Sequence, residues 1–185
     1  MQVTVLSGSR NTEGKTAEAI KAICDGVETG GGATEVFFLP TLKLERCRQC
    51  EANGWGICRR EAWCLIEDDF PMLVDKIKAS DVVVFATPVY FADLSESMRS
   101  FLDRLRRIWA FMEGRPSPDI SAVGLCFSGG GGGGAPSALL NLERIMQMCG
   151  FDIVDMIAMR RQNFDSKLPR LKLTGEWLAT KPNSK

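Results

Sequence analysis

The segment 82–86 limits the fold of this chain strongly, because all of its residues are apolar and consecutive. An amphipathic strand alternates apolar and polar residues, whereas an uninterrupted apolar strand is buried on both faces. Such strands are typical of parallel sheets covered by helices on both sides. Similar runs alternate along the chain with helix-period segments, which predicts an α/β fold with a three-layer open parallel sheet. The predicted strands lie near 2–7, 34–39, 81–87, 120–128 and 152–159.

The segments between these strands have apolar residues at helical spacing. Helices are predicted at 14–28, after the capping carboxylates Asp68 and Asp69, after Ser95, and at 135–149. A weaker helix near 165–179 is predicted to be interrupted by Pro169. The helix after Ser95 has the clearest amphipathic pattern. Its predicted core face carries Leu94, Met98, Phe101, Leu102, Leu105, Ile108, Trp109 and Met112, and its predicted solvated face carries Arg99, Asp103, Arg104, Arg106 and Arg107.

The order of these elements predicts one domain over residues 1–180, with a cysteine-rich loop at 45–66 and a loose tail at 181–185. In open parallel sheets, ligands bind beyond the carboxyl ends of the strands, where the strand order reverses. The loops that follow the predicted strands are therefore the first place to look for a functional site.

Composition excludes several classes of function. The chain has 23 Lys plus Arg against 23 Asp plus Glu, so its balance gives no support for binding nucleic acid or an anionic membrane. It has no histidine, which excludes nucleophilic catalysis with an imidazole base. No signal-peptide pattern opens the sequence and no apolar run reaches about 18 residues, so we expect a cytoplasmic protein.

The loop after the first strand has the composition of an anion site. Ser9, Arg10, Asn11, Gly14, Lys15 and Thr16 lie between a strand and the start of a predicted helix. Backbone N–H groups and the positive end of a helix bind phosphate in such loops, and an ordinary strand-to-helix turn is the alternative. The segment is not a nucleotide-hydrolysing P-loop, because five residues rather than four separate Gly8 from Gly14.

Two further loops are predicted at the same edge of the sheet. Pro88, Val89, Tyr90 and Phe91 follow the third strand and can place backbone amides and an aromatic plane against a flat ring, although aromatic residues here also fit core packing. Ser128 and the run Gly129–Gly134 follow the fourth strand, and bare backbone allows close approach to a ligand. A phosphate loop, a loop for a flat ring and a glycine loop together predict a site for flavin mononucleotide (FMN).

The same residues carry a resemblance to a known family. The chain resembles the NADPH-dependent FMN reductase and iron-sulfur flavoprotein group of the flavodoxin-like superfamily, up to about residue 160. The matching segments are 8–10 with Thr16, 47–50, 64–69, 88–91, 101–104, 128–134 and 149–151. The resemblance implies a flavodoxin-like sheet with five strands in the order 2-1-3-4-5.

The resemblance also implies where FMN binds. Its phosphate would lie on the first loop, and its ring would lie on Pro88, Val89, Tyr90 and Phe91, with Ser128, Gly129, Gly130 and Gly131 along another edge. NADH or NADPH would reduce the flavin, and a small molecule or protein would then accept the electrons. Because the flavin supplies the chemistry, no catalytic acid or base is expected. A homo-oligomer, dimer or tetramer, is also implied.

The cysteine-rich loop leaves three alternatives open. Cys47, Cys50, Cys58 and Cys64 have the spacing CX2CX7CX5C and could hold an iron-sulfur cluster, hold a structural zinc, or stay uncoordinated. The iron-sulfur flavoproteins that the chain resembles use a compact cysteine series in this loop, but here Asn53 stands where a third closely spaced cysteine is expected. A 4Fe–4S cluster that passes electrons to FMN defines the alternative function, an electron carrier.

Several other residues have less specific interpretations. Trp55 and Trp63 either cover a flavin site or anchor the loop, and Cys24, Cys126 and Cys149 are predicted as small buried hydrophobic residues. Some arginines could contact a nicotinamide phosphate, although a solvated surface is the favoured role for most of them. These arginines are Arg104, Arg106, Arg107, Arg115, Arg160 and Arg161.

Overall fold

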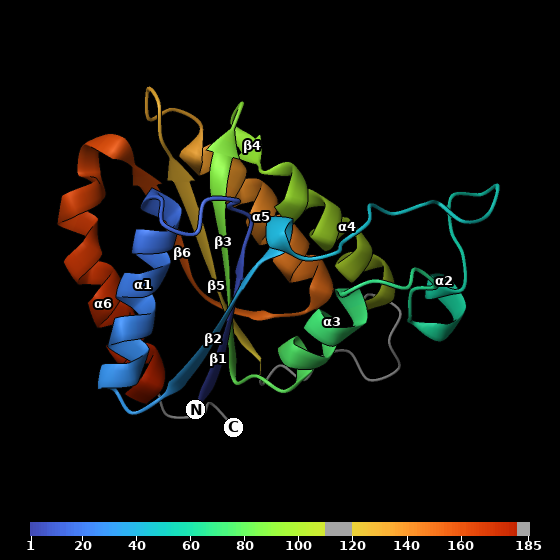
Figure 1. The fold of residues 1–185 in the computed structure, drawn as a ribbon, viewed down its shortest axis with the longest axis horizontal. Helices are drawn as coiled ribbons and strands as arrows, with labels where there is room; N and C mark the ends of the chain where they lie inside the picture. The colour runs from blue at the N-terminus through green and yellow to red at the C-terminus, as the bar shows by residue number, and fades with distance from the viewer. Residues whose placement is uncertain (110–119, 181–185) are drawn as a thin grey trace.

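A parallel sheet forms the centre of the fold in the computed structural model, which describes residues 1–109 and 120–180 (Figure 1). Its strands run in the order β2-β1-β3-β5-β6, and a short strand β4 pairs antiparallel with β3. With β4 set aside, this is the predicted order 2-1-3-4-5, so the fold prediction is confirmed. The strands are β1 (Gln2–Ser7), β2 (Ala33–Phe38), β3 (Val82–Tyr90), β4 (Asp93–Leu94), β5 (Ser121–Ser128) and β6 (Asp152–Arg160).

Helices cover both faces of the sheet, as the apolar run in β3 predicts (Figure 1). Val82 and Val84 pack in the apolar cluster under α1 (Lys15–Thr29) and α6 (Phe164–Thr180). Val83 and Phe85 pack on the other side under α3 (Phe70–Lys78), α4 (Glu96–Trp109) and α5 (Ala135–Cys149). The short helices are η1 (Leu39–Thr41), α2 (Cys58–Glu61) and η2 (Arg161–Asn163).

Helix α6 corrects one prediction, because it continues through Pro169 without interruption. The helix is fixed by its close packing on α1. A Cβ atom at Gly26 would lie 2.0 Å from the backbone oxygen of Lys172, and one at Gly175 would lie 2.1 Å from the oxygen of Ile23. The two backbones therefore approach each other directly at two points, and this tertiary contact outweighs the local effect of one proline.

The contact between α1 and α6 leads to a stability prediction. Replacing Gly175 by alanine places a methyl group against backbone atoms that cannot rotate away, and overpacking of this kind costs about 1–3 kcal/mol. Urea unfolding followed by circular dichroism should show this loss. Leu173→Ala, on the exposed side of the same helix, is the control and should change little. Equal midpoints for the two variants would show that the helices do not approach this closely.

Three predictions concern residues outside the part that the structure describes. They are the position of Met112 on the core face, the role of Arg115, and the loose tail at 181–185. The remaining residues of that core face are buried as predicted. None of the helices in residues 1–109 and 120–180 has both the length and the apolar character required to span a membrane.

Candidate functional site

Three loops meet at the carboxyl edge of the sheet because β1, β3 and β5 are neighbours with matched ends (Figure 1). Ser7 at the end of β1 is level with Ala86, and Pro88 is level with Phe127 near the end of β5. The structure therefore brings the first loop, the aromatic loop and the glycine loop to one edge. The strand order also reverses at β1 and β3, where open α/β sheets bind ligands.

The first loop presents backbone N–H groups at the start of α1. Gly14 is the N-cap residue of this helix and supplies no side chain to occupy the first N–H groups. The Asn11 Oδ1 atom accepts a hydrogen bond from the Glu13 N–H group at 2.9 Å, and the Ser9 hydroxyl donates to the Asn11 carbonyl at 3.1 Å. Ser9 and Thr16 are buried at the base of the loop. The loop is thus ordered by its own polar groups around an uncapped helix end.

The two basic residues of this loop have different surroundings. Arg10 is exposed, and its Nη1 atom donates to the backbone oxygen of Pro40 at 3.4 Å. The Lys15 Nζ atom instead lies 2.9 Å from a carboxylate oxygen of Glu18 and 4.5 Å from the centroid of the Phe164 ring. Arg10 is therefore the basic residue of the loop without a carboxylate partner among the described residues.

A group of hydroxyls that sequence reasoning missed holds the first loop against β3 and α4. The Ser95 N–H group donates to Thr87 Oγ1 at 3.1 Å, and the Thr87 and Ser95 hydroxyls lie 3.0 Å apart. The Ser97 hydroxyl donates to the Gly8 carbonyl at 3.0 Å. A Cβ atom at Gly8 would lie only 2.3 Å from Ser95 Oγ, so this position requires glycine. Little in the sequence signals this group, because Thr87 ends a predicted strand whereas Ser95 and Ser97 lie eight and ten residues later, at the start of a predicted helix.

The aromatic loop is a two-residue β-hairpin between β3 and β4. Phe91 and Ala92 at its tip both have positive φ angles, 51° and 63°, as the favoured hairpin turn requires. Tyr90 is 59% exposed and Phe91 is 104% exposed, so neither side chain fills the core. An ion pair of 2.7 Å between Asp93 and Arg99 fixes the base of the hairpin. The structure therefore removes core packing as the explanation for these two aromatic residues.

The glycine loop is bent back on itself by hydrogen bonds. The Gly132 N–H group donates to the Gly129 carbonyl at 2.8 Å, the Ser128 hydroxyl donates to the Gly133 carbonyl, and Gln162 Nε2 donates to the Gly131 carbonyl at 3.1 Å. Gly134 has a φ angle of 82° and packs against Ala92 of the hairpin. At Gly130 and Gly131, no described atom lies within 4 Å of an added Cβ. The backbone there faces open space, as a surface for a flat ligand would.

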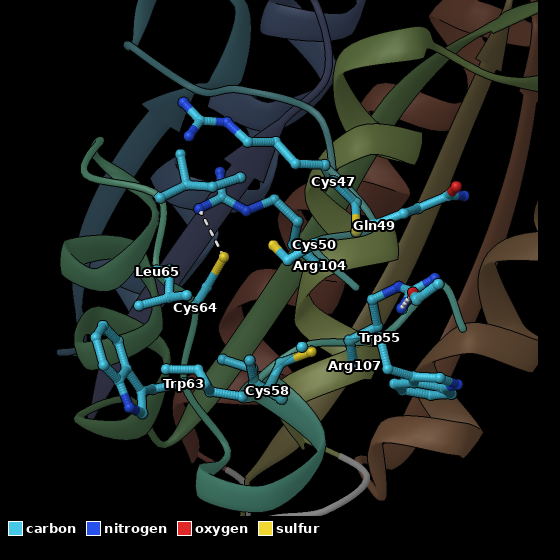
Figure 2. A pocket seen from close by; sticks show the side chains of 16 residues that line it. Cys47, Gln49, Cys50, Trp55, Cys58, Trp63, Cys64, Leu65, Arg104 and Arg107 are labelled. Atoms are coloured by element: carbon cyan, nitrogen blue, oxygen red, sulfur yellow. Dashed lines mark hydrogen bonds between the residues drawn. The ribbon is translucent and has the colours of Figure 1, made fainter. Parts of the chain in front are cut away.

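The cysteine-rich loop lies beside α4, away from the three loops, and encloses a small cavity. All four cysteines of the predicted metal set, Cys47, Cys50, Cys58 and Cys64, line this cavity, together with Trp55 and Trp63 (Figure 2). Its volume is about 20 Å³, which is room for about one water molecule. The Trp63 Nε1 atom donates to Glu61, and the Trp55 ring lies under Arg107, so both tryptophans contribute to the loop's own packing.

Arg104 corrects the prediction of a solvated face on α4, because it is only 2% exposed. Its Nη1 and Nη2 atoms lie 2.5 Å and 3.0 Å from the two carboxylate oxygens of Asp68. Nη2 also donates a hydrogen bond to the Cys64 sulfur at 3.4 Å, and the guanidinium lies 4.1 Å from the centroid of the Phe70 ring. Figure 2 marks the contact between Arg104 and Cys64 with a dashed line. A signal was available, because Arg104 follows Phe101 by three residues and so shares the apolar face.

The two predicted capping carboxylates tie the loop to the start of α3. Asp68 accepts a hydrogen bond from the Phe70 N–H group at 3.1 Å, as a capping residue does, and another from the Glu45 N–H group at 2.8 Å. Asp69 does not cap the helix, because its carboxylate accepts instead from the Lys43 N–H group at 2.7 Å. Both side chains therefore fix the entry to the cysteine-rich loop.

The described arrangement does not fit a 4Fe–4S cluster. The cavity among the four cysteines has the volume of about one water, and Cys64 already accepts a hydrogen bond from Arg104. Residues 1–109 and 120–180 contain no group of three or more histidine, cysteine or acidic side chains placed to hold a metal ion. A cluster would need the loop to open around it.

The remaining three cysteines are buried, as predicted. Burial raises the pKa of the Cys126 and Cys149 thiols to about 12, and burial also raises the pKa of Cys24. These thiols are therefore neutral at physiological pH and pack as small hydrophobic groups.

A comparison with models of protein families identifies the family of this chain. The family model described as NADPH-dependent FMN reductase matches residues 1–164. This chain belongs to the NADPH-dependent FMN reductase family. The match extends from β1 to the start of α6, so it includes the three loops at the sheet edge and the cysteine-rich loop. The resemblance inferred from the sequence is confirmed, and FMN is the cofactor of the family.

Curated relatives of this FMN reductase family member carry two kinds of name. An iron-sulfur flavoprotein of Methanocaldococcus jannaschii is 30% identical over 106 residues, which cover 57% of this chain and 52% of the relative. An NAD(P)H dehydrogenase (quinone) of Archaeoglobus fulgidus is 30% identical over 111 residues, covering 60% of this chain and 54% of the relative. The chain thus spans about half the length of these relatives.

Solved structures agree with the fold of this family member. An NAD(P)H:quinone oxidoreductase from Methanothermobacter marburgensis superposes with a TM-score of 0.70 at 20% identity, over 96% of both chains. A flavodoxin from the domain Archaea superposes with a TM-score of 0.62 at 17% identity, over 98% of both chains. These similarities confirm the flavodoxin-like architecture.

Proposed function

We propose that this protein is an FMN-dependent oxidoreductase that accepts hydride from NADH or NADPH and passes electrons to an acceptor. One observation carries the proposal: an uncapped helix N-terminus, an exposed aromatic hairpin and a bare glycine backbone meet at one edge of the sheet. These three features match the phosphate, the ring face and the ring edge of FMN. The family, and the names of the relatives, support the same reaction.

The phosphate of FMN is assigned to the first loop. The N–H groups at the start of α1 and the buried hydroxyl of Thr16 are donors for its oxygens, and Arg10 adds a positive charge. We keep Lys15 in the predicted set as a weaker contact, because it is paired with Glu18. The predicted set is completed by Ser9, Asn11 and Gly14, which shape the loop.

The ring of FMN is assigned to the other two loops. Pro88, Val89, Tyr90 and Phe91 offer an apolar surface, and Ser128, Gly129, Gly130 and Gly131 offer backbone groups to the ring edge. The open space beside Gly130 and Gly131 fits a flat ring, because a side chain at either position would fill it. Gln162 holds this backbone in place through its hydrogen bond to Gly131.

When bound, FMN supplies the hydride and electron chemistry. The residues of the chain bind it, orient it and keep its surroundings fixed, so the absence of histidine is no obstacle. The acceptor is a small molecule or a protein. A cytoplasmic location and a homo-oligomeric state, dimer or tetramer, are part of this proposal.

The proposal is tested by reconstitution of the purified protein. Adding FMN to the apoprotein should produce a saturable change in the visible spectrum of the flavin. Anaerobic stopped-flow mixing of the loaded protein with NADPH and with NADH should then bleach the flavin absorbance with at least one of them. FMN that does not bind, or bound flavin that neither donor bleaches, would refute the oxidoreductase.

Thr16→Val tests the assignment of the phosphate. Valine has nearly the shape of threonine but lacks the hydroxyl, and Thr16 is only 4% exposed at the base of the first loop. The loss of one hydrogen bond should weaken FMN binding by about 1 kcal/mol, roughly fivefold in dissociation constant. Fluorescence titration measures this, and riboflavin, which has no phosphate, should bind both proteins equally. Equal FMN affinities would show that the loop does not hold the phosphate.

A second candidate function, an iron-sulfur electron carrier, is favoured by the four cysteines around one cavity and by the names of several relatives. It needs a rearrangement of the cysteine-rich loop, since the cavity is too small for a cluster. Iron and sulfide analysis of protein purified without oxygen separates the two. Stoichiometric iron and sulfide without bleaching by NADPH supports the carrier, whereas bleaching without iron supports the oxidoreductase.

A further inference from the structure

An arginine-rich groove lies between the cysteine-rich loop and α4, outside the predicted FMN set. It has a volume of about 660 Å³, within the usual range for small-molecule sites, and is lined in part by Arg46, Arg48, Ser100, Asp103, Arg106 and Arg107. We propose that this groove binds the 2′-phosphate end of NADPH and so selects NADPH over NADH. This inference rests on the proposed function and assigns residues to its electron donor.

The charge balance of the groove favours an anion. Arg106 is paired with Asp103 at 3.0 Å, and Arg48 is paired with Glu45 at 2.8 Å. Arg46 and Arg107 have no carboxylate partner among the described residues. The Nη1 atom of Arg107 donates to the Gly54 carbonyl at 2.7 Å, so a backbone dipole orients it without neutralising it. Within residues 1–109 and 120–180, the groove therefore holds two guanidinium charges that no carboxylate compensates.

The groove is connected to the candidate flavin site. A second hollow of about 330 Å³ shares Arg46 and Ser100 with it and extends along α4 to Pro40 and Ser97. Ser97 donates to Gly8 of the first loop, and Pro40 accepts from Arg10, so this hollow begins beside the phosphate loop. From Ser97 to Arg107 the helix rises about 15 Å. A dinucleotide with one end at the flavin can therefore reach the arginines.

The shape and chemistry of the groove favour a phosphate over an acidic protein surface. Guanidinium groups from two elements, the loop at 46–48 and α4, converge on one concave space, whereas a protein-docking patch is usually broad and flat. Arginine binds phosphate through paired hydrogen bonds, and a dianionic 2′-phosphate matches the charge of two arginines that lack a carboxylate partner among the described residues. NADH lacks this phosphate, so the groove distinguishes the two donors.

The test measures binding of the oxidised dinucleotides NADP⁺ and NAD⁺ to the FMN-loaded protein by isothermal titration calorimetry. Arg46→Gln removes an exposed charge that has no ion-pair partner in the described part of the chain, and should weaken NADP⁺ binding about tenfold, with NAD⁺ binding changed less than about twofold. Arg107→Gln removes the other guanidinium of the groove that has no carboxylate partner among the described residues, and is a second variant with the same expected direction. Arg170→Gln, on the exposed surface of α6 across the sheet, is the matched control and should leave both affinities unchanged.

The outcomes separate this inference from the proposed function. If wild-type flavin is bleached by NADPH but both groove variants bind NADP⁺ normally, the inference is wrong and the oxidoreductase stands. If no nicotinamide bleaches the flavin, titration with adenosine 2′,5′-bisphosphate tests the groove alone: binding lost in Arg46→Gln supports it, and unchanged binding overturns it. Binding of polyglutamate to the groove, with no binding of either nucleotide, also overturns it and indicates an acidic protein partner.

Discussion

Replacing Asp68 by alanine is expected to lower the free energy of unfolding by about 3–5 kcal/mol, a large fraction of the stability of a single domain. The reason is the charge left behind. Asp68 and Arg104 have side chains that are 0% and 1% exposed, and they share two hydrogen bonds. Without the carboxylate, the guanidinium of Arg104 stays in an apolar site next to Phe70 with no opposite charge. Urea denaturation followed by circular dichroism measures the loss.

Three variants distinguish this mechanism from a general effect of mutation. Asp75→Ala removes the carboxylate of an exposed pair with Lys78 and should change stability by less than about 1 kcal/mol. Arg104→Met combined with Asp68→Leu removes both charges and should recover part of the loss, because apolar residues can replace a buried pair. The recovery is incomplete because the N–H groups of Glu45 and Phe70 still lose their acceptor. If the single variant Asp68→Ala is as stable as the wild type, the ion pair between Asp68 and Arg104 does not anchor the cysteine-rich loop.

The same pair predicts how stability depends on pH. Burial alone would raise the pKa of Asp68, but hydrogen bonds from Arg104 and from the N–H groups of Glu45 and Phe70 hold this pKa below its ordinary value. The unfolded chain therefore binds the proton more readily than the folded chain. The stabilisation is complete above about pH 5, where the unfolded carboxyl is ionised, and is lost as the pH falls through the lowered pKa of the folded state.

The architecture was predictable because the signals were local and repeated. The uninterrupted run in β3 requires burial on both faces, and the apolar periods between strands require covering helices. Strand order came from the family resemblance and is confirmed. The two-residue strand β4 was missed because a hairpin this short has no periodicity to detect.

The errors came from contacts between segments far apart in the sequence. Pro169 was expected to interrupt α6, but Gly26 and Gly175 allow α1 and α6 to pack backbone to backbone. Arg104 was assigned to solvent by its charge, although its position on the helix puts it on the apolar face. Its partner, Asp68, lies 36 residues earlier, so only the folded structure shows that the charge is neutralised.

In the candidate site, too, local features could be predicted from the sequence and contacts between distant segments could not. The three loops could be placed at one edge from sequence, because the carboxyl ends of parallel strands meet there. The hydroxyls of Thr87, Ser95 and Ser97, which position the first loop, were not predicted, because serine and threonine are common in any loop. The arginine-rich groove also joins residues from two elements, and no single segment of the sequence shows it.

Replacing Gly131 by alanine is expected to weaken FMN binding roughly tenfold to a hundredfold while leaving the empty protein as stable as before. Gly131 has an ordinary backbone conformation, and no described atom lies within 4 Å of a Cβ built there. The apoprotein therefore has room for the methyl group. In the proposed complex the edge of the flavin ring occupies this space. The methyl group therefore clashes with the ring, and either the ring or the loop must shift when FMN binds.

Gly133→Ala is the matched control for Gly131→Ala. Gly133 lies in the same loop, also has an ordinary φ angle and also has no described atom within 4 Å of an added Cβ, but it lies outside the predicted FMN contacts. Its variant should therefore bind FMN within about twofold of the wild type. Fluorescence titration gives the affinities, and thermal unfolding of the apoproteins confirms that both variants fold. If both variants bind FMN as tightly as the wild type, the ring does not lie on Gly131. If Gly133→Ala alone weakens binding, the contacts of the glycine loop are shifted by two residues toward α5.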